Sequence, residues 1–250
     1  MKKLLVLAIV LSTLLIGCSQ STDKKVLKVL VSADFPPYES IDTDGTFIGF
    51  DIDFGNAIAE KMGVEFQWVD TSFAGIIAAL QANSGDLAIS GMSVTPEREE
   101  AVDFSDVYKV EGETFTVLAL ATKGLSTADD LSGLIGSAQI GTVQEQALNI
   151  LKTDLSLTVD IRDKYDVIVQ EIIIGRIDFL LVDAAVAAEF VVAYPELSSF
   201  TLQHTSLAAI NGIGVAMPEG SDLKEDVNKA IAEMKADGSL QALIDKWFNN

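Results

Sequence analysis

The 250-residue chain contains one cysteine, Cys18, and one histidine, His204. A single cysteine excludes an internal disulfide bond and any metal site built from several cysteines. The sequence also contains no P-loop, no GxGxxG segment, no nucleophile elbow and no HExxH motif. The usual signatures of nucleotide-binding, hydrolytic and zinc-dependent enzymes are therefore missing, and we expect no cofactor and no metal.

Positively charged residues are scarce. Lysine and arginine number 17 against 37 aspartates and glutamates, which gives a formal net charge of −20. Such a surface repels nucleic acid and anionic lipid headgroups, so we expect no nucleic-acid partner. The acids are spread along the chain and apolar residues make up 49% of it, which is typical of a folded globular protein and not of an acidic tail.

The N-terminal apolar run, from Leu4 to Ile16, is shorter than the roughly 18 residues expected of a membrane span. Because Lys2 and Lys3 precede it, the pattern indicates a secretory signal peptide. Roughly 225 residues remain, enough for one large domain or two of ordinary size. No repeat, low-complexity tract or proline-rich linker marks a boundary between domains.

The end of this run, Leu15-Ile16-Gly17-Cys18, resembles the bacterial lipobox. The resemblance implies that residues 1–17 are removed as a lipoprotein signal peptide and that Cys18 carries a lipid. Residues 18–25 would then be the lipidated cysteine and a polar tether that holds the protein to a membrane outside the cytoplasm, either in the periplasm or on the outer face of the cell membrane. An ordinary signal peptide that happens to end near a cysteine is the alternative.

Short apolar runs alternate with amphipathic segments along the rest of the chain, which predicts an α/β fold with mainly parallel strands. Strands are expected at 26–31, 64–69, 86–90, 114–121, 137–142, 176–183 and 212–217. Helices are expected at 51–62, 73–82, 144–152, 164–174, 184–193, 221–236 and 239–248.

Polar residues follow four of the expected strands, and ligands of open α/β sheets bind just beyond the carboxyl ends of strands. These residues are Ser32, then Ser90, Gly91 and Ser93, then Thr142, and finally Asp183. For Ser32 and Thr142, capping of a following helix and contact with a ligand explain the residue equally well. Asp183 closes an apolar stretch and needs a cationic partner if it is buried.

Arg98 stands in an unusual place in the segment SGMSVTPER, residues 90–98. Thr95 and Pro96 predict a helix start, so the arginine falls in a first turn, where the helix dipole disfavours a cation. One interpretation is that Arg98 lies on a solvated surface, where the neighbouring glutamates neutralise its charge. Alternatively, the guanidinium forms an anion site that binds a carboxylate through two parallel hydrogen bonds. Together with Asp183, such a site suits a zwitterion.

Four segments carry a resemblance over nearly the whole chain: GFDIDFGNAIAEKMG (49–63), SFAGIIAALQ (72–81), DLAISGMSVTPEREEAVDFSDVY (86–108) and ADGSLQALIDKWF (236–248). They resemble the family 3 extracellular solute-binding proteins, the amino-acid receptors of bacterial ABC importers. The resemblance implies a type II periplasmic binding protein fold, with two α/β lobes joined by two crossover strands around a ligand cleft. Lobe 1 would span 26–112 plus 210–250, and lobe 2 would span 113–209.

By the same resemblance, Arg98 would bind the ligand α-carboxylate, helped by backbone N–H groups near Ser93 and Thr142. Asp183 would accept from the α-ammonium, together with the Ser90 carbonyl and the Ser93 hydroxyl. Phe35 and Phe73 match positions where family members pack aromatic rings against the ligand side chain. The aspartates of GFDID, Asp51 and Asp53, are interpreted as helix caps.

The sequence departs from the commoner family pattern at Ser32, where receptors for basic amino acids often have an acid. It also departs at Gly91, where some have serine, and at Val143, where many have threonine. These departures weaken an assignment to lysine or arginine, but a basic ligand stays open because Glu39, Glu111 or Glu113 could reach the pocket. A neutral polar or small apolar ligand is open as well, and no second arginine favours an acidic one.

The resemblance implies a monomer that passes an amino acid to an ABC permease and its ATPase. Two other functions share the fold. A dehydratase would need a general acid or base in the cleft, and the sequence offers no evident one. A ligand-sensing module for a membrane kinase would need a separate signalling partner.

Overall fold

The computed structural model describes residues 24–110, 115–207 and 212–249. The predicted signal peptide and Cys18 lie outside this range, as do Glu111, Glu113 and the predicted lobe boundaries at 112/113 and 209/210. No helix within the described residues is both long and apolar enough to cross a membrane.

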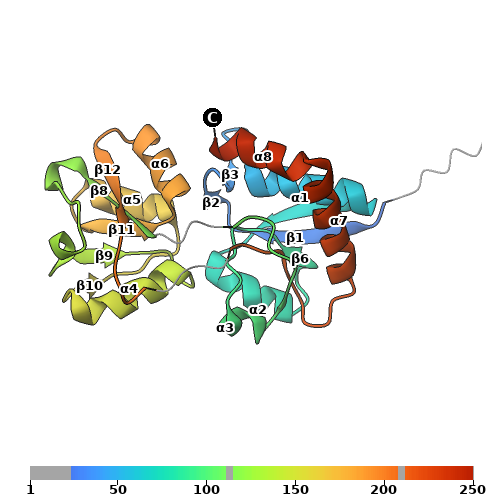
Figure 1. Ribbon diagram of the computed structural model, residues 1–250, viewed down its shortest axis with the longest axis horizontal. Coiled ribbons are helices and arrows are strands. Elements are labelled where there is room, and N and C mark those ends of the chain that lie inside the picture. The colour runs from blue at the N-terminus through green and yellow to red at the C-terminus, as the bar shows by residue number, and fades with distance from the viewer. Residues whose placement is uncertain (1–23, 111–114, 208–211, 250) are drawn as a thin grey trace, which may run out of the picture.

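Two mixed five-stranded sheets form the centres of two α/β lobes (Figure 1). The first sheet has the order β5-β1-β6-β13-β7. Its strands are β5 (Glu65–Asp70), β1 (Val26–Val31), β6 (Leu87–Ala88), β13 (Ala216–Met217) and β7 (Asp103–Phe104). The second sheet has the order β10-β9-β11-β8-β12. Its strands are β10 (Thr158–Val159), β9 (Ile135–Ser137), β11 (Phe179–Val182), β8 (Phe115–Leu120) and β12 (Leu197–Leu202).

The expectation of mainly parallel strands holds for only half of each sheet. In the first sheet β1 runs parallel to β5 and β6, whereas β13 runs antiparallel to β6 and β7. In the second sheet β9 runs parallel to β10 and β11, whereas β8 runs antiparallel to β11 and β12. Both reversed strands follow a passage of the chain from one sheet to the other, so each enters its new sheet from the opposite end.

Helices cover both faces of each sheet (Figure 1). In the first lobe α1 (Phe50–Met62), α7 (Leu223–Asp237) and α8 (Ser239–Phe248) cover one face, and α2 (Ile76–Gln81) with the short α3 (Pro96–Glu99) lies on the other. In the second lobe α5 (Tyr165–Ile173) and α6 (Ala184–Ala193) lie opposite α4 (Val143–Asp154). Alternation along β1 explains the two layers, since Leu27 and Val29 pack with the α1 side while Leu30 packs with α2.

The remaining elements are short. A small antiparallel sheet of β2 (Asp34–Phe35), β3 (Glu39–Ile41) and β4 (Phe47–Ile48) adjoins the first lobe, and 3₁₀ turns lie at Phe73–Gly75, Ala121–Lys123 and Asp129–Leu131. The strand predicted at 137–142 is wrong, because β9 ends at Ser137. β12 was not predicted at all.

Candidate functional site

One pocket lies between the two lobes, beyond the strand ends of both sheets, and the space in it not occupied by atoms is about 320 Å³. All nine residues expected to bind ligand line it: Ser32, Phe35, Phe73, Ser90, Gly91, Ser93, Arg98, Thr142 and Asp183. Glu39, Gln139, Val143, Gln144 and Tyr165 complete the lining. The structure thus brings the predicted residues together, and their binding role stays a prediction.

Arg98 is buried at one end of the pocket, with 7% of its surface exposed. The predicted helix start is confirmed, since the Thr95 hydroxyl accepts from the Arg98 backbone N–H at 3.3 Å and Pro96 is the first helical residue. The guanidinium donates from Nη1 to the Ser93 carbonyl at 2.7 Å and from Nη2 to the Gly141 carbonyl of the second lobe at 3.0 Å. These bonds fix its plane while leaving N–H groups for a ligand.

No carboxylate within the described residues forms an ion pair with Arg98. The alternative of a solvated arginine neutralised by neighbouring glutamates is therefore wrong. Burial lowers the pKa of Arg98 to about 10, although nearby Glu97 acts in the opposite direction. A buried guanidinium without an anionic partner is expected where the anion comes from a ligand.

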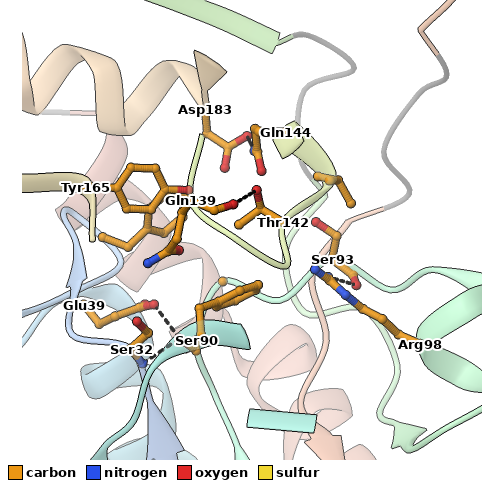
Figure 2. Close-up of a pocket in the computed structure, with 14 residues that line it drawn as sticks. Ser32, Glu39, Ser90, Ser93, Arg98, Gln139, Thr142, Gln144, Tyr165 and Asp183 are labelled. Atoms are coloured by element: carbon orange, nitrogen blue, oxygen red, sulfur yellow. Dashed lines mark hydrogen bonds between the residues drawn. The ribbon is translucent and has the colours of Figure 1, made fainter. Parts of the chain in front are cut away.

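Asp183 faces the same pocket from the second lobe, at the N-terminal end of α6 (Figure 2). Its side chain is not used as a helix cap, and its Oδ1 accepts from Gln144 Nε2 at 3.0 Å. Figure 2 shows Asp183 on the far side of the pocket from Arg98. The pocket therefore presents a cation and an anion from opposite lobes.

Ser32 and Thr142, which the sequence left between capping and ligand contact, behave differently. Thr142 caps α4, since its hydroxyl accepts from the Glu145 N–H at 3.1 Å. The Ser32 hydroxyl instead donates to Asp34 Oδ1 at 2.9 Å, and no helix begins after it. The Ser32 backbone N–H donates to the hydroxyl of Ser90 at 2.9 Å, which ties together two pocket-lining strand ends.

Aromatic rings line the side of the pocket. The rings of Phe35 and Tyr165 stack across the lobes with centroids 5.1 Å apart, and the guanidinium of Arg98 lies 5.4 Å from the Phe73 ring centroid. Gly91 makes room for this arrangement, because a Cβ atom there would come within 3.1 Å of the Phe35 ring. The departure from serine at this position thus has a packing reason.

The interpretation of Asp51 and Asp53 as helix caps is wrong, since α1 has no side-chain cap. Asp51 is buried and accepts from the Gly91 N–H at 2.6 Å and from the Tyr108 hydroxyl at 2.9 Å. Asp53 accepts from Trp247 Nε1 at 2.8 Å. Asp51 therefore supports the pocket loop from behind, and Asp53 ties α1 to α8.

Sequence reasoning missed Gln139, Gln144 and Tyr165 as pocket residues. Gln139 donates to the Asp163 carbonyl at 2.9 Å and to Asp34 of the first lobe at 3.2 Å. Both glutamines flank Thr142, so applying the strand-end rule to the whole loop after β9 would have found them. Tyr165 gave no such signal, because it opens a helix and reads as core.

Several hydrogen bonds join the lobes directly. Asp34 Oδ2 accepts from the Tyr165 backbone N–H at 2.9 Å, and Ser72 Oγ donates to Asp163 Oδ1 at 2.6 Å. The Arg98 bond to Gly141 also crosses the cleft. The structure is therefore in a closed arrangement, with both lobes in contact around the pocket. No group of His, Cys, Asp or Glu able to hold a metal is found among the described residues.

Comparison with known proteins places this geometry in a family. The model of the bacterial extracellular solute-binding proteins, family 3, matches residues 27–250. The arginine-binding extracellular protein ArtP of Bacillus subtilis is 32% identical over 99% of this chain and 98% of its own length. The L-cystine-binding protein TcyJ of Escherichia coli is 35% identical over 90% of this chain and 84% of its own length.

Solved structures agree with this assignment. An ancestral arginine-binding protein bound to arginine has a TM-score of 0.82 and 34% identity, covering 90% of this chain and 99% of its own. The ancestral amino acid-binding protein AncCDT-1, a precursor of cyclohexadienyl dehydratase, has a TM-score of 0.77 and 33% identity, covering 89% of this chain and 95% of its own. The chain belongs to the family 3 extracellular solute-binding proteins and has their type II periplasmic binding protein fold.

Proposed function

We propose that this family 3 solute-binding protein captures a free amino acid between its lobes and delivers it to the permease of an ABC importer. The observation that carries the proposal is the placement of Arg98 and Asp183, with opposite charges, on one pocket from opposite lobes. The amino-acid-binding relatives, including the arginine-binding and cystine-binding proteins, support the same ligand class.

In this proposal the ligand carboxylate binds the unused N–H groups of Arg98. The ligand ammonium binds Asp183, the Ser90 carbonyl and the Ser93 hydroxyl. Phe35 and Phe73 pack against the ligand side chain, and Gly91 leaves room for the Phe35 ring. The pocket lining supplies each of these groups within one small volume.

Closure of the lobes follows from the division of the site. A ligand that bridges Arg98 and Asp183 binds the closed arrangement better than the open one, so it shifts the population toward closure. In the closed arrangement the two lobes already meet at the hydrogen bond that Arg98 Nη2 donates to the Gly141 carbonyl. A permease that recognises the closed form would then receive only loaded protein.

We also propose the organisation expected from the sequence. Residues 1–17 are a signal peptide and Cys18 carries the lipid that anchors the protein to a membrane outside the cytoplasm, either in the periplasm or on the outer face of the cell membrane. Lobe 1 comprises 26–112 plus 210–250, lobe 2 comprises 113–209, and the protein acts as a monomer. The membership of the strands in two separate sheets supports these lobe limits, and the lipobox-like segment before Cys18 supports the anchor.

Calorimetric titration with an amino acid and its derivatives tests the proposed binding mode. The free amino acid should bind, and its carboxamide, which lacks the carboxylate, should bind at least about 30-fold more weakly because a buried charged contact is worth about 2 kcal/mol or more. The analogue that lacks the amino group should also bind more weakly, because it has no ammonium group to interact with Asp183. The bound ligand should be recovered chemically unchanged, and its conversion to another compound would favour an enzyme.

A further inference from the structure

The start of α5 lies against the first lobe through Asp34, a residue that does not line the pocket. Asp34 Oδ2 accepts from the backbone N–H of Tyr165, the first residue of the helix, at 2.9 Å. The side-chain amide of Gln139 donates to the same oxygen at 3.2 Å, and the ammonium group of Lys164 lies 3.8 Å from Oδ1. All three groups belong to the second lobe, so one carboxyl group of the first lobe gathers three contacts across the cleft.

The local sequence explains why α5 takes its capping acceptor from the other lobe. The residue before the helix is Lys164, whose ammonium group offers only donors and makes no capping hydrogen bond. The free N–H groups of a helix start need an acceptor, which is usually a serine, threonine, aspartate or asparagine at that position. Asp34 supplies the acceptor from the first lobe, and its negative charge suits the positive end of the helix dipole. The Tyr165 N–H therefore gains this acceptor only when the lobes meet.

A second contact crosses the lobes beside this one. Ser72 precedes the 3₁₀ turn that begins at Phe73, but its hydroxyl does not cap that turn. The hydroxyl donates instead to Asp163 Oδ1 of the second lobe at 2.6 Å. Lys164 also lies 3.9 Å from Asp70, at the end of β5. The lobe clasp is defined as this set of groups: Asp34 and Ser72 on the first lobe, and Asp163, Lys164 and the Tyr165 N–H on the second.

Two opposing effects decide whether the clasp favours closure. Closure removes Asp34 from water, leaving 11% of its side chain exposed. This burial raises the pKa of Asp34, and the four surrounding donor groups act against that rise. Without the carboxyl group, however, the closed form would bury the N–H of Tyr165, a residue that is 1% exposed, with no acceptor. A buried donor without an acceptor is costly, whereas water reaches the same N–H in an open form. The clasp should therefore stabilise the closed form.

We propose that the lobe clasp holds part of the ligand-free protein closed, and that Asp34 is the positioning residue that fixes the start of α5 against the first lobe. Through these contacts Asp34 sets where Tyr165 and Gln139 stand in the wall of the pocket. The clasp adds the same free energy to the closed form whichever ligand is bound. Because apparent affinity scales with the fraction of protein that is already closed, every ligand gains by the same factor. This effect on affinity rests on the proposed function, whereas closure of the ligand-free protein does not.

Single-molecule energy transfer on the ligand-free protein tests the clasp. Dyes are placed on Glu65→Cys and Val192→Cys, two exposed positions on different lobes, and Cys18→Ser prevents a third label. The labelled protein should show a closed population without ligand. Asp34→Ala should lower the ratio of closed to open molecules by about 2- to 30-fold, the range for loss of a helix cap. Ser72→Ala, which removes one hydrogen bond, should lower the ratio by about two- to tenfold.

Asp166→Ala is the matched control. Asp166 is exposed in the first turn of α5 and accepts from the N–H of Val167 in its own helix at 2.8 Å. Its loss removes the same charge from the same helix end without breaking a contact between the lobes. The ratio of closed to open molecules should therefore stay within about twofold of its original value. Urea unfolding midpoints verify that all three variants are folded.

Calorimetric titration of the unlabelled variants with L-arginine and with L-glutamine separates positioning from direct contact with the ligand. Asp34→Ala should weaken binding of both amino acids by the same factor, so that the ratio of their affinities is unchanged. Weakening that differs between the two by more than about fivefold would show direct ligand contact and overturn the positioning role.

The ligand-free measurement decides the clasp itself, whatever the pocket binds. A ligand-free protein that is entirely open would overturn the clasp. An unchanged or higher ratio of closed to open molecules in both Asp34→Ala and Ser72→Ala would also overturn it. A fall in Asp166→Ala as large as that in Asp34→Ala would show that the start of α5, and not the contact between the lobes, is responsible.

Discussion

Replacement of Arg98 by alanine should abolish ligand capture while costing the fold little. Of the five N–H groups of a guanidinium, two donate to the carbonyls of Ser93 and Gly141, at 2.7 and 3.0 Å. The others are available for a ligand carboxylate. Truncating one partner of a buried charge pair costs about 2–5 kcal/mol, which weakens binding by about 30- to 5,000-fold.

The stability of the ligand-free protein should respond differently. The variant loses two hydrogen bonds, each worth about 1 kcal/mol, but it also removes a buried charge whose desolvation lowers the pKa of Arg98 to about 10. The two effects oppose each other, so the free energy of unfolding should change by no more than about 2 kcal/mol. Urea unfolding without ligand measures this change, and calorimetric titration measures the affinity.

Two further variants make the result specific. Arg98→Lys keeps the charge but loses the planar fork, so its affinity should lie between wild type and Arg98→Ala. Arg176, whose side chain is 71% exposed, is the control, and Arg176→Ala should change neither quantity measurably. Affinity of Arg98→Ala within about threefold of wild type, a difference of less than about 1 kcal/mol, would refute the assignment of Arg98 to the ligand carboxylate.

Three further changes have expected outcomes. Asp183→Asn should weaken amino-acid binding at least about 30-fold in calorimetry because the amide cannot neutralise an ammonium, and unchanged affinity would exclude Asp183 as its partner. Gly141→Ala should weaken binding about tenfold and reduce the lobe closure that small-angle scattering detects. Gly141 has a φ of 80°, and a Cβ atom added there would come within 3.1 Å of the Ala74 Cα in the other lobe. Normal closure of the variant would contradict this reasoning. Because the pKa values of Glu39 and Asp51 are raised on folding, these two groups hold more protons in the native state than in the unfolded chain above about pH 4, so their contribution to ligand-free stability should fall as pH rises from about 4 through 6. Urea unfolding at several pH values should show that fall, and Glu39→Gln should make it shallower; an unchanged slope in the variant would show that Glu39 is not its source.

The longer elements could be predicted because their apolar residues recur with a clear period. The helices α1 and α4 to α8 and the strands β1, β5, β8 and β11 lie within a few residues of their expected positions. Strands of two or three residues, such as β2 and β7, are too short to show any alternation. Strand direction also escaped prediction, because the same apolar run suits a parallel or an antiparallel neighbour.

The candidate site was predictable where a local rule was broken or a strand ended in polar residues. Arg98 stood out because a first helical turn disfavours a cation, and Asp183 because it closes the buried strand β11. Gln139 and Tyr165 depend on how the second lobe meets the first, through contacts with Asp34 and Phe35. Asp51 was misread because its partners, Gly91 and Tyr108, lie 40 and 57 residues away.

Thermal unfolding of the purified protein with each of the twenty amino acids tests the central claim most directly. Any ligand already bound should first be removed by unfolding and refolding. A ligand present at about one hundred times its dissociation constant should add about 2.7 kcal/mol of stability. The account predicts that one amino acid or a few raise the unfolding midpoint, and that the rise disappears in Arg98→Ala. An unchanged midpoint with all twenty, or a rise that persists in Arg98→Ala, would contradict capture of an amino acid between the two lobes.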